Sequence, residues 1–498
     1  MKTFALQLTS LTLILLPLLG YSQKPNVLFI IADDLNTRIG PYMGISEHTP
    51  NLSRLANEGV KFDRAYCQFP LCGPSRASLM SGLYPETSGT LNNVDQIGSY
   101  RAANPQLANH PSMAGFFREQ GYFTARVSKI FHMGVPGGIE QGSAGGDDPD
   151  SWDYAYNVMG PETLSRGELE LLSPKDLHYG SNFAKMMVPD SLDFTQTDYL
   201  AASQAIAILE SRAASVAEDA QNKVKLKPDS PFFLSVGFVR PHVPLIAPES
   251  YFTPYPWQEV TLPEVAGLDQ VPPRALTRQN DKIWGMSERQ QQETIAAYMA
   301  SVRFMDAQVG RLLAALDQLN LRENTIVVFV SDHGYNLGEH DCWSKVSLWE
   351  GSVRVPMIIS APDDRFNQNR GTSCEATVEL IDLYPTLLDL SGYAPQQPAI
   401  LQGKSLVEWL EDSNHQSDDE HHAYTISYEG TAASLKRGEW RYTRWGDETE
   451  GSNEELYHHA SDPEEHHNLA NDPSKQKALE EMREKFNQVK QEVQAALP

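Results

Sequence analysis

The chain has 498 residues, 41% of them hydrophobic and 21% charged, which is an ordinary composition for a soluble globular protein. This length exceeds what one compact core usually supports, so two lobes or a large domain with an appendage are expected. The formal net charge of -25 argues against nucleic acid or an anionic membrane as the main partner.

The N-terminus has the pattern of an export signal. Lys2 precedes an apolar run from Leu6 to Leu19, and the small residues Gly20 and Ser22 follow. This is typical of a secretory signal peptide over residues 1–22. The run is too short to span a membrane and no basic stop follows it. We therefore expect an exported protein, periplasmic or secreted, with no membrane span.

Alternating strands and helices predict the fold class of the larger part. Continuous apolar runs predict buried strands over residues 26–34, 231–242, 325–333 and 355–362. Amphipathic helices are predicted over residues 49–59, 198–221, 287–319 and 377–392, the last kinked at Pro385. This order predicts an α/β domain with a mainly parallel sheet between helices.

Two segments differ from the rest of the chain in composition and hydrophobic periodicity. Residues 133–190 are rich in Gly, Pro and Asp with weak periodicity, and so long a loop-rich insertion is more often functional than accidental. After about residue 412, short alternating segments predict antiparallel strands, and a helix follows from about Ser474. We expect a domain over residues 23–412 and a smaller C-terminal antiparallel α+β lobe over residues 413–498.

Acidic residues follow two of the predicted strands. Asp33 and Asp34 end the first, and Asp332 and His333 end the third. In open α/β sheets, sites form beyond the carboxyl ends of the strands. Three carboxylates gathered there would repel one another unless a cation lay among them, and oxygen ligands favour Ca²⁺ or Mg²⁺. Each pair alone also fits a helix cap or a turn, but their occurrence on matched strands favours a metal site.

Cys72 lies just before the predicted N-terminus of a helix. Pro74 suits the first turn and Gly82 the end, so unpaired N–H groups and the helix dipole would favour an anion beside residue 72. The residues alone leave four interpretations open: a core thiol, a disulfide half, a thiolate nucleophile, or a precursor of another group. The other cysteines are Cys67, Cys342 and Cys374, whose spacing fits no zinc pattern and whose pairing the sequence does not indicate.

The stretch around Cys72 resembles the maturation signature of type I sulfatases. That signature, C-x-P-S-R followed by Leu and a small residue before Gly, is matched here by Cys72, Pro74, Ser75, Arg76, Leu79, Ser81 and Gly82. The stretches "PNVLFIIADD", "SDHG" and "ELYHHASDPEEHHNLA" extend the resemblance over nearly the whole chain. It implies an alkaline-phosphatase-like fold and oxidation of Cys72 to formylglycine by a formylglycine-generating enzyme. One hydroxyl of the aldehyde hydrate would attack sulfur, and the second would then expel sulfate.

The same resemblance implies roles for the polar residues. Ca²⁺, with Mg²⁺ as the alternative, would be held by Asp33, Asp34, residue 72, Asp332 and His333. Arg76 and Lys129 would hold the formylglycine, and His132 would deprotonate its second hydroxyl. Lys345 and His242 would contact the sulfate. We further assign His242 as the general acid to the leaving oxygen, because an alkoxide leaves poorly without a positioned proton donor.

Two departures from the broad sulfatase pattern indicate a branch. The spacing Lys129-x-x-His132 replaces Lys-x-His, and His333 replaces Asn after the second metal Asp, as in iduronate-2-sulfatase-like sulfatases. The resemblance implies a sulfated oligosaccharide containing uronic acid, from ulvan or a glycosaminoglycan, as substrate. The alternatives are a phosphatase or phosphodiesterase of the alkaline-phosphatase-like superfamily and a non-catalytic glycan-binding relative. The intact signature disfavours the first, and the complete set of charged residues disfavours the second.

Overall fold

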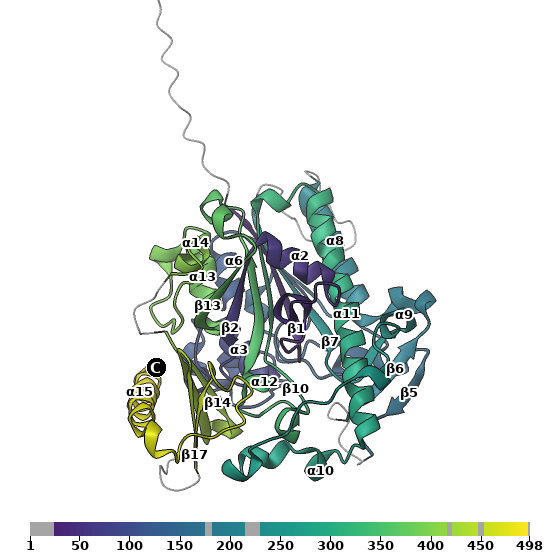
Figure 1. Ribbon diagram of the computed structural model, residues 1–498. Helices are drawn as coiled ribbons and strands as arrows, with labels where there is room; N and C mark the ends of the chain where they lie inside the picture. Colours follow the sequence, from purple (N-terminus) through teal and green to yellow (C-terminus); the bar gives the residue numbers. More distant parts are fainter. Residues whose placement is uncertain (1–23, 175–181, 215–229, 416–420, 447–452, 497–498) are drawn as a thin grey trace, which may run out of the picture.

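Eight strands form the central sheet of the protein in the computed structural model, which describes residues 24–174, 182–214, 230–415, 421–446 and 453–496 (Figure 1). The predicted signal peptide lies outside the described residues. In spatial order the strands are β13 (Thr372–Glu379), β2 (Val60–Tyr66), β12 (Arg354–Ser360), β9 (Thr325–Ser331), β1 (Asn26–Asp33), β7 (Phe232–Pro241), β3 (Phe123–Ser128) and β4 (Tyr154–Tyr156). Among them β12 alone runs antiparallel to its neighbours, so the predicted mainly parallel sheet is confirmed.

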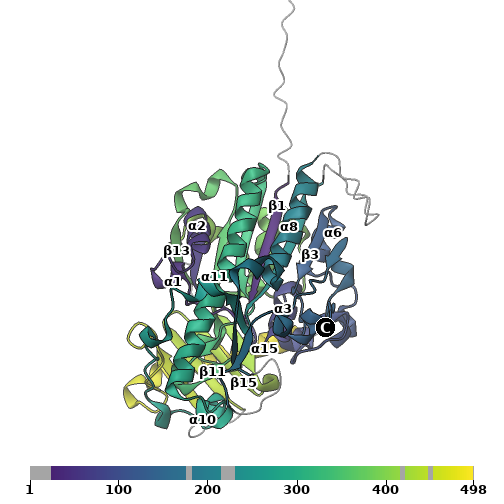
Figure 2. The same cartoon turned by 90° about the vertical axis from the view of Figure 1, so that its right-hand side faces the viewer.

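Helices cover both faces of this sheet, as continuous apolar strands require. Val27, Phe29 and Ile31 of β1 face one side and belong to the same apolar core as α3 (Cys72–Ser81), α6 (Met113–Glu119) and α13 (Leu383–Leu390). Leu28 and Ile30 face the other side, where α2 (Pro50–Glu58), α8 (Thr197–Ala213) and α11 (Glu288–Gln318) pack. Figure 2 shows α8 and α11 running alongside β1 on that face.

The predicted long helices are confirmed where the structure describes them. Ser287 and Gln290 form a capping box at the start of α11. Residues 215–221 of the other predicted helix lie outside the described residues. The predicted helix over residues 377–392 is wrong in its first part, because Thr377–Glu379 pair with β2 as the end of β13. Pro385 lies in the first turn of α13, where a proline is tolerated, and not at a kink.

The segment over residues 133–190 contains strands that its weak periodicity did not reveal. It contributes β4 to the central sheet, and β5 (Glu168–Leu171) and β6 (Ala184–Val188) pair with β8 (Leu245–Pro248) in a three-stranded sheet. A two-stranded sheet joins β10 (Asn336–Leu337) and β11 (Trp343–Ser344). Shorter helices are α1 (Gly40–Met43), α4 (Pro85–Ser88), α5 (Ser99–Ala103), α7 (Gly137–Glu140), α9 (Glu249–Phe252), α10 (Asn280–Ile283), α12 (Glu350–Val353) and α14 (Val407–Glu411).

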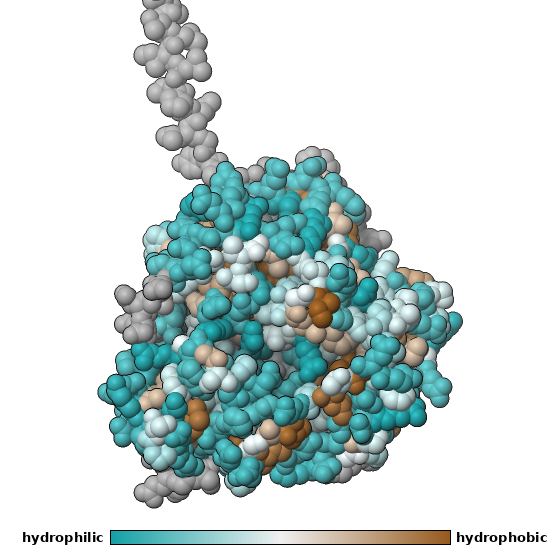
Figure 3. Space-filling view, in the orientation of Figure 1, coloured by the Kyte–Doolittle hydropathy of each residue, from teal (hydrophilic) through white to brown (hydrophobic). Residues whose placement is uncertain are grey.

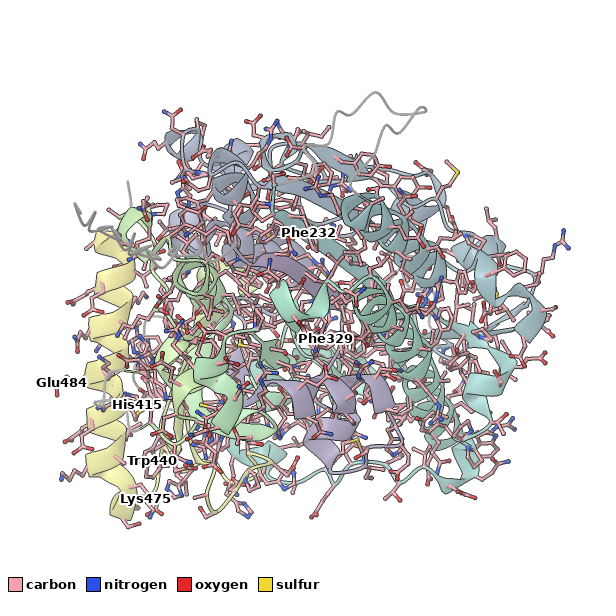
Figure 4. All side chains as sticks on the ribbon, turned by 90° about the horizontal axis from the view of Figure 1, so that it is seen from above. Phe232, Phe329, His415, Trp440, Lys475 and Glu484 are labelled. Carbon is pink, nitrogen blue, oxygen red and sulfur yellow. The ribbon has the colours of Figure 1, made fainter. Side chains whose placement is uncertain are left out.

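A second, antiparallel sheet lies beside the central one, as the sequence predicted. It consists of β14 (Ala423–Ser427), β15 (Ala432–Arg437), β16 (Trp440–Trp445) and β17 (Glu454–His458), and α15 (Gln476–Ala495) covers it. Met482, Phe486 and Val489 are buried at helical spacing in the core beneath α15. Figure 4 shows Glu484 on the outer side of α15, whereas Phe232 and Phe329 lie inside the central domain. The domain boundary at residue 412 stays a prediction.

One face of the molecule is mainly polar (Figure 3). Hydrophilic side chains cover most of the face in Figure 3, with small apolar patches toward its lower edge. None of the helices in the described ranges is both long and apolar enough to cross a membrane.

Candidate active site

Two neighbouring parallel strands bring the predicted acidic residues together. Ala32 of β1 lies opposite Ser331 of β9, so both strands end at the same edge of the sheet. The carboxylate oxygens of Asp33, Asp34 and Asp332 lie within 4.8 Å of one another, and all three side chains are buried. This gathering of buried acids is what the strand pattern predicted.

His333 completes a set of electron-pair donors that fits a cation. Its Nδ1 lies 2.8 Å from the carbonyl oxygen of Gly334 and donates to it, so Nε2 is the ring nitrogen that faces the acidic residues. Nε2 lies 3.3 Å from Oδ1 of Asp34 and 3.7 Å from Oδ2 of Asp332. Acceptor atoms that converge in this way repel one another unless a cation or proton lies between them. The residues therefore fit a metal ion with mainly oxygen ligands and one imidazole.

Cys72 is the first residue of α3, one position inside the helix where the sequence placed it just outside. The helix ends at Gly82, whose φ of 71° is a left-handed conformation that favours glycine. The Sγ atom of Cys72 lies 3.4 Å from Nε2 of His333 and accepts a hydrogen bond from Nζ of Lys345 at 3.0 Å. Cys72 thus lies next to residues of the predicted metal-ligand set.

The surroundings of Cys72 disfavour both a thiolate and a disulfide. Burial, together with the nearby carboxylate of Asp33, raises the pKa of the Cys72 thiol. The neutral thiol is therefore the stable form, and a thiolate nucleophile is disfavoured. Cys67, Cys342 and Cys374 are also buried free thiols, so none of the four cysteines forms a disulfide.

Arg76 lies between the two acidic strand ends. Its guanidinium Nε donates to Oδ2 of Asp332 at 2.8 Å, and Nη2 lies 3.2 Å from Oδ1 of Asp33. Nη1 donates to the carbonyl oxygens of Lys129 and Ile130 at 2.6 and 3.1 Å. The side chain is fully buried. In the cysteine form of the protein, Arg76 therefore joins three chain segments at the carboxyl edge of the sheet.

Two lysines bring further positive charge to the acidic cluster. Nζ of Lys129 lies 2.5 Å from Oδ2 of Asp33, and Nζ of Lys345 lies 2.5 Å from Oδ1 of Asp34. Burial would raise the pKa of Asp33, but the positive charges around it, Lys129 first, outweigh burial and hold that pKa well below its ordinary value. The pKa of Asp34 is lowered in the same way, mainly by Lys345. Both carboxylates are therefore ionised at neutral pH.

The two predicted histidines have different neighbours. Nε2 of His242 lies 3.8 Å from Oδ2 of Asp34, and its Nδ1 donates to the carbonyl oxygen of Val243 at 2.6 Å. His132 lies 3.7 Å from the exposed carboxylate of Asp95, and its buried Nδ1 has no hydrogen-bond partner among the described residues. Burial and then Lys129 lower the pKa of His132 well below its ordinary value, so the ring is neutral.

One residue that shapes the turn at Asp34 was not predicted from the sequence. The hydroxyl of Tyr298 in α11 donates to the carbonyl oxygen of Asp34 at 2.8 Å and accepts the N–H of Asn36 at 2.9 Å. This contact accompanies the positive φ of 65° at Asp34. Tyr298 occurs on the apolar face of a long helix, so its spacing indicates only core packing, and no local signal distinguishes it.

The alkaline-phosphatase-like fold places a candidate metal-ligand set beside Cys72, the first residue of α3. The model of the sulfatase family matches residues 25–393, and a model described as N-sulphoglucosamine sulphohydrolase, C-terminal, matches residues 338–492. The chain therefore belongs to the sulfatase family, whose members generally use a metal ion and formylglycine, and it is a sulfuric ester hydrolase.

Proteins that are similar in sequence to this chain are themselves named as sulfatases. A sulfatase of Formosa agariphila is 34% identical over 93% of this chain and 87% of its own length. The iduronate 2-sulfatase of Homo sapiens is 31% identical over 74% of this chain and 69% of its own length. An ulvan-active sulfatase of Formosa agariphila is 27% identical over 93% of this chain and 80% of its own length.

Solved structures share the fold. A 2-O glycosaminoglycan sulfatase superposes with a TM-score of 0.69 at 23% identity, over 95% of this chain and 93% of the other. A phosphonate monoester hydrolase from Silicibacter pomeroyi has a TM-score of 0.71 at 21% identity, over 94% and 96% of the two chains. The architecture alone therefore does not separate sulfate from phosphonate esters, and the distinction depends on the site.

Proposed function

We propose that this protein is an exported sulfatase that removes sulfate esters from oligosaccharides containing uronic acid, from ulvan or a glycosaminoglycan. The observation that supports it most directly is the convergence of Cys72 with four metal-ligand side chains and with buried Lys and Arg side chains. The names of the relatives suggest the substrate, since they include an iduronate 2-sulfatase and an ulvan-active sulfatase. The pattern of residues 1–22 suggests export.

Ca²⁺ is the proposed metal, with Mg²⁺ as the alternative. Asp33, Asp34, Asp332 and His333 would hold it together with residue 72, since donor atoms of Asp33, Asp34 and Asp332 lie within 4.8 Å of one another, as do those of Asp34, Cys72 and His333. The ion would supply positive charge to the transferring sulfuryl group, and formylglycine at residue 72 would supply a hydroxyl nucleophile and a second hydroxyl that releases sulfate. A formylglycine-generating enzyme would be needed to convert Cys72.

The chain's own residues then have distinct tasks. Lys345 is within hydrogen-bond distance of both Asp34 and residue 72, so its ammonium group can bind a sulfate oxygen beside the reacting atom. Arg76 and Lys129 orient residue 72 and balance the acidic cluster. The neutral ring of His132 can accept a proton from the second hydroxyl.

His242 is the proposed proton donor to the leaving oxygen. Its Nδ1 is occupied by the carbonyl oxygen of Val243, so Nε2 is the atom that faces the site. Burial lowers the pKa of His242, so Nε2 carries the transferable proton only in the charged ring, which the negative charge of a bound sulfate ester would favour. A sugar alkoxide is a poor leaving group, and a positioned acid typically contributes about 10²–10⁴-fold to such a step.

The test is sulfate release from a panel of defined oligosaccharides of ulvan, heparan and dermatan, measured by ion chromatography. Wild-type protein co-expressed with a formylglycine-generating enzyme should release sulfate from at least one of them. Cys72→Ala should release none, whereas Cys374→Ala, which changes a buried cysteine of β13, should retain the wild-type rate. Hydrolysis of a phosphodiester or phosphonate ester with no sulfate release from any oligosaccharide would refute the proposal.

Export has its own test. Expression of the full chain in a Gram-negative host, followed by fractionation and N-terminal sequencing, should place the mature protein outside the cytoplasm with its first residue near Gln23. A cytoplasmic protein that retains Met1 would refute export without affecting the enzymatic proposal.

A further inference from the structure

A buried ion pair connects the segment over residues 133–190 to the strand that carries His242. Oε2 of Glu162 lies 2.5 Å from Nη2 of Arg240, and the two side chains are 0% and 3% exposed. The other carboxylate oxygen of Glu162 accepts a hydrogen bond from the hydroxyl of Thr197 at the start of α8. Glu162 thus fixes one end of the Arg240 guanidinium deep inside the protein.

The other end of the same guanidinium holds the backbone around His242. Nη1 of Arg240 donates to the carbonyl oxygen of His242 at 2.9 Å and to that of Pro244 at 3.0 Å. One of these carbonyl groups belongs to Pro244 and the other to His242, which follows Pro241, and a proline has no N–H to donate. The planar fork of an arginine can bind the Glu162 carboxylate with one nitrogen and these carbonyls with the other.

A second carboxylate holds this segment from the opposite side. Asp198 in the first turn of α8 accepts the backbone N–H of Val239 at 2.7 Å and that of Arg240 at 3.0 Å. Its side chain is 1% exposed. The backbone from residue 239 to residue 244 is therefore held by hydrogen bonds to the buried side chains of Asp198 and Arg240 on both sides of His242.

A buried ion pair such as that of Glu162 with Arg240 is an inefficient way to stabilise a fold. Removing two charges from water costs free energy that a buried apolar pair would avoid, so a buried ion pair is weak support for a purely stabilising role. Buried charged groups are better explained where they specify one geometry. Here, the geometry they specify is the position of His242, whose ring is in turn oriented by the Val243 carbonyl.

We propose that Glu162, Arg240 and Asp198 are positioning residues that hold His242 where it can protonate the leaving oxygen. This inference rests on the role given to His242 in the proposed function. It also gives the segment over residues 133–190 a task in the reaction, because Glu162 comes from that segment. None of the three residues is assigned to contact the substrate.

The test uses a series of sulfate esters whose alcohols range from nitrophenol to an unactivated alkyl alcohol. Proton donation matters little when the leaving group is a stable nitrophenolate and most when it is an alkoxide. Arg240→Met should therefore lower kcat for the alkyl ester by about 10²-fold or more, and for the nitrophenyl ester by less than about threefold. KM should change little for either ester, and Arg240→Lys should recover part of the loss.

Controls separate positioning from general loss of structure. Arg322→Met is the control: Arg322 lies just before the amino end of β9 and forms an ion pair with Glu58. Its replacement should affect all esters equally. If Arg240→Met does not fold, Glu162→Gln answers the same question, because it keeps the shape of the side chain. An equal loss on all esters for the folded Arg240 or Glu162 variant, or no loss at all, would overturn the inference. Absence of sulfate release from oligosaccharides by the wild type would instead refute the proposed substrate.

Discussion

Replacement of Arg76 by methionine is the sharpest test of how the charges at this site depend on one another. The change keeps an unbranched apolar stem but removes the guanidinium, the only group that contacts both Asp33 and Asp332 among their described hydrogen-bond partners. It also removes the donor to the carbonyl oxygens of Lys129 and Ile130. Two buried carboxylates and three buried carbonyl groups, that of Ala32 included, would each lose a partner.

The magnitude follows from the full burial of this side chain. Breaking a buried ion pair by removing one partner typically costs about 3–5 kcal/mol, since the remaining charge stays out of water. An unfolding entropy of about 2.1 cal/mol/K per residue corresponds to roughly 1 kcal/mol/K for a chain of this length. Arg76→Met should therefore lower the unfolding midpoint by about 3–5 °C.

Differential scanning calorimetry after chelation of divalent cations measures this effect. Added calcium should reduce the shift, because the ion would offset the same carboxylate charges. Arg54→Met is the matched control: Arg54 pairs with Glu58 and Asp317 at the surface, where its side chain is 41% exposed. Surface pairs contribute about 0–1 kcal/mol, so its midpoint should fall by less than about 1 °C. Equal shifts for the two variants would refute the reasoning.

Three further predictions concern maturation, the metal and pH. Intact-mass spectrometry of active protein should show residue 72 lighter by about 18 Da than cysteine; an unmodified thiol in fully active enzyme would contradict this. Dialysis against EDTA should abolish sulfate release and Ca²⁺ should restore it, since the acceptor atoms of Asp34 and His333 converge there; full activity of the metal-free protein would contradict the site. Burial raises the pKa of Glu455 to about 7, although Tyr457 and two tryptophans donate to it. The folded state therefore binds the proton more tightly, and this stabilisation is present below pH 4 and is lost as pH rises toward 7. Glu455→Gln should reduce the fall in unfolding free energy between pH 5 and pH 8 by up to about 3 kcal/mol, as measured by urea titration; an unchanged pH slope would contradict the assigned shift.

The hydrophobic pattern of the sequence correctly predicted the strands and helices that consist of long apolar or amphipathic runs. The strands that became β1 and β9 and the helix that became α11 have enough residues for their periodicity to be distinctive. The start of the predicted helix over residues 377–392 was wrong because a few residues fit either period, and pairing with β2 decided the outcome. The direction of β12 was likewise undecided locally, since an apolar run has the same pattern in either orientation.

The sequence by itself determined which chemistry this protein can perform. The spacing of Cys72, Pro74 and Arg76 defines the maturation signature, and acidic residues at the ends of apolar strands indicate a cation, because both depend only on residue type and order. The tertiary structure alone decided which charges meet. Arg76 reaches Asp332 across 256 positions, and Glu162 reaches Arg240 across 78. Such contacts arise from how layers pack in space, so no local pattern in either segment reveals the partner that holds His242 in place.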